Sequence, residues 1–190
     1  MSESLNQNFN HLKVHTQYSI CEGAAKIDDL QEYCKSNKIK SLGISDTSNL
    51  CGALEFAEKI SKSGTQPIIG TQINFKLNDT TGLLPLFALN ETGYKNIIEL
   101  SSNSYLENDE LSDPHVNFDE LLKNSDGVSV FSGTVLGLFG KLFDKGKFTE
   151  INEIYSKIKN VFGDRFYLEI QRHNDTNENG FEKFNLKQSV

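Results

Sequence analysis

Several runs of strand-forming residues in this sequence end in side chains that could bind a metal ion or a phosphate. The residues at these ends are His15, Asp46, Gln72, Gly133 with Thr134, and Arg172 with His173. If the runs form parallel strands, their carboxyl ends meet at one edge of a sheet or one mouth of a barrel. Imidazoles and carboxylates at such an edge are ligands that divalent metals accept. The pattern therefore favours a metal or phosphate site, with His15 at its start.

Each of these side chains also has a structural interpretation. His15 could be held by a backbone carbonyl, and Asp46 lies just before a helical pattern that its carboxylate could cap. Glu22 stands in a turn, and Arg172 with His173 could bind a phosphate or a partner's carboxylate, or lie in a solvated loop. Two histidines and two carboxylates at unrelated spacings specify a metal site only weakly, so both interpretations stay open at this point.

The elements that would position these residues alternate along the chain, first strand and then helix. Strands are predicted at residues 12–14, 40–45, 67–75, 82–89, 128–131 and 166–170. Apolar periodicity predicts helices lined by Ile27, Leu30 and Cys34, by Leu50, Leu54 and Ala57, by Tyr94, Ile97 and Ile98, and by Ile151, Ile154, Tyr155 and Ile158. Asn117 and Glu120 resemble a capping box before another helix, and residues 102–117 read as a long polar loop. The repeated order predicts an α/β fold with parallel strands.

Composition narrows the class of protein. The chain has 190 residues, a net charge of −7 and a sequence pI of about 5.1. This acidic balance disfavours sequence-independent binding to DNA or to an anionic membrane. Cys21, Cys34 and Cys51 are odd in number and lack CxxC spacing, which predicts reduced, mostly structural thiols. Neither a signal core nor an apolar run of membrane-spanning length is present in the sequence. We therefore expect one cytoplasmic domain.

Five blocks of residues follow one another in the order seen in a known family. They are residues 14–19, residues 44–46 with 49–52, residues 67–70, residues 88–97 and residues 167–173. Across about residues 9–175 the chain resembles the N-terminal polymerase-and-histidinol-phosphatase (PHP) domain of the bacterial DNA polymerase III alpha subunit, in its proteobacterial type. The resemblance implies a distorted (β/α)7 barrel over residues 9–190, preceded by a disordered tail at residues 1–8. It also implies that the last strands of the barrel and the polymerase domains would follow Val190.

The resemblance implies a depleted metal site. Where metal-binding relatives carry ligands, this chain has Lys13, Thr47, Gln72, Leu83 and Thr134, whereas His15, Glu22, Asp46 and His173 remain. A protonated lysine cannot ligate a cation, and Gln72 removes a negative charge. We therefore expect no bound metal, no cofactor and no catalytic residue in this domain, with Lys13 and Arg172 as counter-charges to the carboxylates.

Two functions from different classes remain. In the first, the domain is a non-catalytic scaffold within a replicative DNA polymerase and docks the proofreading 3′–5′ exonuclease subunit and other holoenzyme subunits. Exposed apolar residues in the segment 102–117, including Tyr105 and Leu106, are then the first candidates for the docking surface. In the second, the domain is a residual metal-dependent phosphoesterase, either a proofreading exonuclease or a pyrophosphatase. The resemblance assigns Mg²⁺-dependent nucleotide addition, and DNA binding, to the parent protein rather than to this domain.

Overall fold

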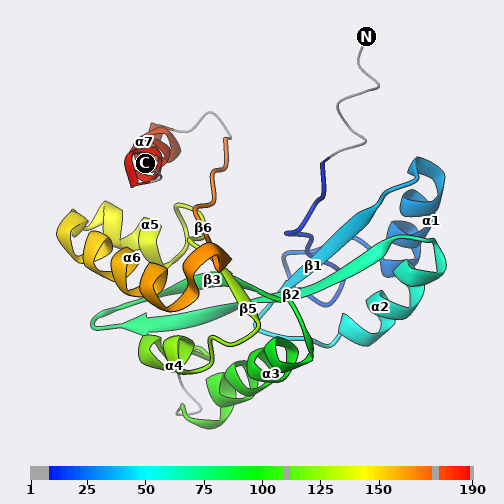
Figure 1. The fold of residues 1–190 in the computed structure, drawn as a ribbon, viewed down its shortest axis with the longest axis horizontal. Coiled ribbons are helices and arrows are strands. Elements are labelled where there is room, and N and C mark those ends of the chain that lie inside the picture. The colour runs from blue at the N-terminus through cyan, green and yellow to red at the C-terminus, as the bar shows by residue number, and fades with distance from the viewer. Residues whose placement is uncertain (1–8, 109–111, 173–175, 189–190) are drawn as a thin grey trace. The chain divides into compact units, whose positions relative to one another are not determined.

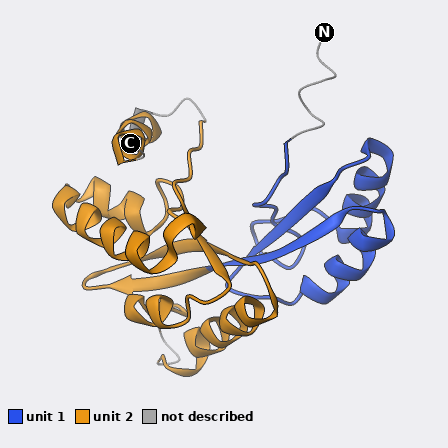
Figure 2. Cartoon of the chain, viewed as in Figure 1, with its two compact units in different colours: residues 1–72 blue, residues 73–190 orange. Residues whose placement is uncertain are grey.

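A computed structural model describes residues 9–108, 112–172 and 176–188 and shows an α/β fold, as predicted (Figure 1). The chain divides into two compact units, with the boundary between Gln72 and Ile73 (Figure 2). The predicted tail at residues 1–8 and His173 lie outside the described residues. None of the helices in the described ranges has the length and apolarity needed to cross a membrane.

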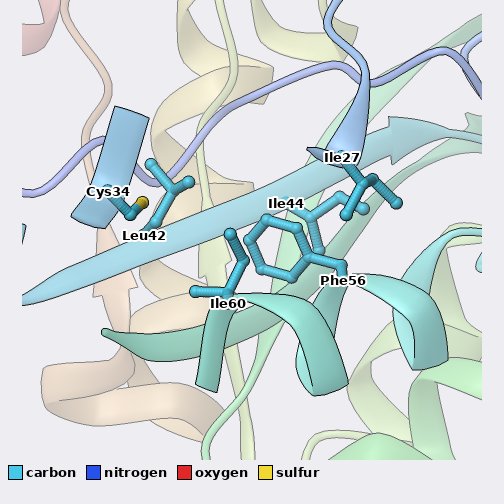
Figure 3. Close-up of a cluster of buried hydrophobic side chains, with 6 residues drawn as sticks. All are labelled: Ile27, Cys34, Leu42, Ile44, Phe56 and Ile60. Atoms are coloured by element: carbon cyan, nitrogen blue, oxygen red, sulfur yellow. The ribbon is translucent and has the colours of Figure 1, made fainter. Parts of the chain in front are cut away.

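Unit 1 is built from two helices and two parallel strands. Its elements are α1 (Ile27–Asn37), β1 (Ser41–Thr47), α2 (Ala53–Lys62) and the first part of β2 (Gln66–Leu77). β1 pairs in parallel with β2, and Asp46 lies opposite Thr71. Figure 3 shows the core of this unit, where side chains from α1, β1 and α2 meet: Ile27, Cys34, Leu42, Ile44, Phe56 and Ile60.

The helix faces of unit 1 agree with the sequence for α1 and differ for α2. In α1, Ile27 and Cys34 are buried and Leu30 packs beside them, as predicted. In α2, the inward face is Ala53, Phe56 and Ile60, whereas Leu54 is 73% exposed. The predicted face was wrong: Leu50 lies before the first residue of the helix, and the inward stripe is one residue earlier than predicted.

The three cysteines are unpaired by disulfides but differ in their surroundings. Cys34 is buried in the core of unit 1, where burial raises the pKa of its thiol. Cys21 and Cys51 are exposed. The prediction of structural thiols therefore holds for Cys34 and is wrong for the other two.

The segment before α1 runs along β1 without forming the regular strand predicted at residues 12–14. The amide of Gly43 donates to the carbonyl of His11 at 2.7 Å, and the amide of Ser45 donates to the carbonyl of Val14 at 2.8 Å. An isolated parallel bridge then joins Thr16 to Ala25. These bonds hold the following turn beside the carboxyl end of β1.

Unit 2 contains the rest of the chain. Its elements are the second part of β2, β3 (Thr80–Ala88), α3 (Glu91–Leu106), β4 (Val116–Asn117), α4 (Phe118–Lys123), β5 (Val128–Phe131), α5 (Leu138–Asp144), α6 (Phe148–Phe162), the 3₁₀ helix η2 (Gly163–Arg165), β6 (Phe166–Tyr167) and α7 (Thr176–Gln188). Figure 1 shows α3 and α4 on one side of β3 and β5, with α5 and α6 on the other. The inward face of α6 is Ile151, Ile154, Tyr155 and Ile158, as predicted.

The strand directions of unit 2 correct the expectation of an all-parallel sheet. β2 pairs in parallel with β4, and β5 pairs in parallel with β6. β3 and β5, however, are antiparallel, with Leu86 opposite Val130. Parallel order was inferred from alternating elements, but β2 leads directly into β3 through a turn at Asn78, with no helix between them.

Three local expectations in unit 2 also differ. The loop predicted at residues 102–117 is shorter, because α3 continues to Leu106. Asn117 is the N-cap residue of α4, but its side chain makes no capping hydrogen bond. The strand predicted at residues 166–170 ends at Tyr167.

Candidate functional site

Asp46 is the centre of a hydrogen-bonded network in unit 1. Its side chain is buried at the end of β1, and the residue is 1% exposed. Its Oδ1 accepts from the amide of Thr16 at 2.6 Å and from the hydroxyl of Ser19 at 2.6 Å. Its Oδ2 accepts from the hydroxyl of Thr16 at 2.7 Å. Three short bonds from neutral donors hold this carboxylate in place.

His15 is held by side chains on both ring nitrogens. Its Nε2 lies 3.0 Å from Nε2 of Gln72, and its Nδ1 lies 3.3 Å from Oγ of Ser19. Because the Ser19 hydroxyl donates its proton to Asp46, its oxygen is free to accept from His15. In this arrangement Nε2 accepts from the Gln72 amide and Nδ1 donates to the Ser19 hydroxyl oxygen.

The rim of the network is formed by Glu22 and Thr47. The Thr47 hydroxyl donates to Oε2 of Glu22 at 2.5 Å, and the same carboxylate oxygen lies 3.7 Å from Nδ1 of His15. The side chain of Glu22 is 49% exposed, so water remains available to it. The Thr47 amide donates to Oγ of Ser19 at 3.2 Å, which links the rim to the buried centre.

Close packing of the backbone fixes the loops around this centre. The Thr71 hydroxyl donates to the carbonyl of Asp46 at 2.6 Å, and the amide of Ser48 donates to the carbonyl of Gln72 at 2.7 Å. A Cβ atom on Gly52 would lie 2.7 Å from Cδ2 of Tyr18 and 3.3 Å from Oδ2 of Asp46. The carboxylate therefore lies in a crowded pocket of protein atoms.

Beside the network, charged residues connect the turn to both helices of unit 1. The Tyr18 hydroxyl donates to Oε2 of Glu55 at 2.7 Å, which raises the pKa of Tyr18 because the bond favours the neutral phenol. Lys59 donates to Oε1 of Glu55 at 2.7 Å and also pairs with Asp28. Lys59 and then Tyr18 lower the pKa of Glu55, and the two carboxylates raise the pKa of Lys59.

The structure brings together some of the residues that the sequence singled out. His15, Glu22, Asp46, Thr47 and Gln72 form one network in unit 1. Asp46 does not cap α2, whose N-cap residue is Gly52, so the capping interpretation was wrong. Gln72 lies within β2 rather than at its end.

The remaining predicted positions belong to unit 2. Thr134 lies in a turn, where its hydroxyl accepts from the amide of Leu136 at 3.3 Å, and Leu83 lies in β3. Arg172 pairs with Glu182 of α7, with its Nε 3.0 Å from Oε1. The expectation that Arg172 neutralises the carboxylates of the site is therefore replaced by an ion pair within unit 2.

Sequence reasoning missed the residues that supply the donors. Thr16 and Ser19 donate to the carboxylate of Asp46 and Thr71 donates to its backbone carbonyl, yet none of the three was proposed as a site residue. Thr16 and Ser19 directly follow His15 in the sequence, and two hydroxyls beside a candidate ligand were the available signal. In the part of the chain that the structure describes, no three His, Cys, Asp or Glu side chains are grouped to hold a metal.

Lys13 stays a predicted counter-charge for the network. Replacing it with methionine keeps the aliphatic stem but removes the ammonium, so we expect the free energy of unfolding to fall by about 1 kcal/mol. Urea unfolding measures this change, and Lys26→Met at an exposed position is the matched control. Equal stability of the two variants would show that Lys13 does not serve the carboxylates.

Comparison with known proteins shows the family of this chain. The chain belongs to the PHP domain family, whose model matches residues 11–173. It is similar to the DNA polymerase III alpha subunit of Caulobacter vibrioides, with 38% identity over 186 residues, and to that of Borreliella burgdorferi, with 37% over 181 residues. These similarities confirm the resemblance to PHP domains of the DNA polymerase III alpha type.

The matches cover most of this chain but a small part of the relatives. They include 91% of the chain and 16% of the Caulobacter protein, and 90% of the chain and 16% of the Borreliella protein. Among solved structures, a Bifidobacterium adolescentis protein described as a metal-dependent phosphoesterase matches with a TM-score of 0.41 and 20% identity. That match covers 50% of this chain and 32% of the other.

Proposed function

We propose that this chain is a PHP domain whose former metal site has become a structural centre, within the alpha subunit of a replicative DNA polymerase. The observation that carries the proposal is that both carboxylate oxygens of Asp46 accept hydrogen bonds, from the amide and hydroxyl of Thr16 and from the hydroxyl of Ser19. These bonds hold the turn against β1, so a metal that took their place on the carboxylate would also loosen the turn.

The other members of the network support the same role. The side-chain amide of Gln72 lies within hydrogen-bond distance of Nε2 of His15. This ring nitrogen would otherwise be available to a metal. The Thr47 hydroxyl donates a hydrogen bond to Glu22, the second carboxylate of the network. With two carboxylates and one imidazole, the network lacks the charge that two or three divalent ions need.

The role of the parent protein follows by analogy with its relatives. We propose that it is a DNA-directed DNA polymerase of the cytoplasm, which binds DNA and adds nucleotides with Mg²⁺ in domains outside this chain. In this assembly the PHP domain is a scaffold that docks the proofreading exonuclease subunit and other holoenzyme subunits.

An assay of phosphoester hydrolysis separates this scaffold from the alternative, a residual metal-dependent phosphoesterase. We expect no turnover of p-nitrophenyl phosphate, pyrophosphate or 3′-ended oligonucleotides above background, with Mn²⁺, Zn²⁺ or Mg²⁺ present. The control is the His15→Ala variant, because a contaminating enzyme would be unaffected by it. Turnover by the wild type that this substitution abolishes would establish the phosphoesterase and contradict the scaffold.

A further inference from the structure

No further inference is drawn: the strongest candidate, the outer edge of β6, which within the described residues pairs only with β5 and borders a hollow lined by α6 and the end of α7, would take one more strand of the same polypeptide, and this restates the family's expected barrel, whose last strands follow Val190.

Discussion

Replacing Asp46 with alanine is expected to lower the free energy of unfolding by about 3–5 kcal/mol. The substitution leaves the amide and hydroxyl of Thr16 and the hydroxyl of Ser19 buried without their acceptor. Each orphaned donor costs about 1–3 kcal/mol, and the bonds lost are to a charged group. Ser19 also loses the orientation that lets its oxygen accept from His15 and from the Thr47 amide.

Urea unfolding of the Asp46→Ala variant measures this loss directly. Glu22→Gln is the matched control, because it removes the other carboxylate of the network, whose side chain is 49% exposed, and should cost less than about 1 kcal/mol. The sign of the Asp46 effect decides between two kinds of site. In a metal site that holds no metal, neighbouring carboxylates repel one another. Removing one of them would leave the free energy of unfolding unchanged or higher.

Replacing Gly23 with alanine should lower the free energy of unfolding by about 2–3 kcal/mol. A Cβ atom at this position would lie 2.1 Å from the carbonyl oxygen of Thr16 and 2.8 Å from the carbonyl carbon of His15. Both neighbours are backbone atoms and cannot rotate away. The turn must therefore move, and it carries the two Thr16 donors away from Asp46.

The control for this prediction is a glycine with room around it. In Gly180→Ala the new Cβ would lie 3.5 Å from the ring of Phe143, an ordinary contact, and the position is inside α7. Alanine is favoured over glycine within a helix by up to about 1 kcal/mol, so this variant should be neutral or more stable. Equal changes in the free energy of unfolding for the two substitutions would show that the turn at Gly23 accommodates a Cβ atom without strain.

Local patterns in the sequence predicted the elements with strong periodicity. The bounds of β5 and the inward face of α6 agree with the structure, because Val128–Phe131 and the stripe from Ile151 to Ile158 are decided by residues close in the sequence. Local sequence also placed His15 and Asp46 at the ends of two segments. In the structure these segments are adjacent, because the segment before α1 runs along β1.

Features that depend on distant residues could not be predicted in this way. The antiparallel direction of β3 and β5 is set by which strands pair, and a single strand's pattern does not contain that information. The extension of α3 through the serines at 101, 102 and 104 overrides their weak helix propensity, because Leu100 and Ser104 are buried within unit 2. The donors to the carboxylate of Asp46 come from a turn 27 to 30 residues earlier in the chain, and only the folded turn directs them at the carboxylate.

The metal content of the folded chain tests the central claim most directly. The protein is expressed with added zinc and manganese, purified without chelator at neutral pH and examined by elemental analysis and thermal unfolding. We expect less than about 0.1 zinc or manganese ion per chain and no rise of the thermal midpoint with added metal, because a ligand that binds the folded state would raise it. One or more tightly bound ions per chain, whose removal by EDTA lowers the midpoint, would show that His15, Asp46 and Glu22 still form a metal site.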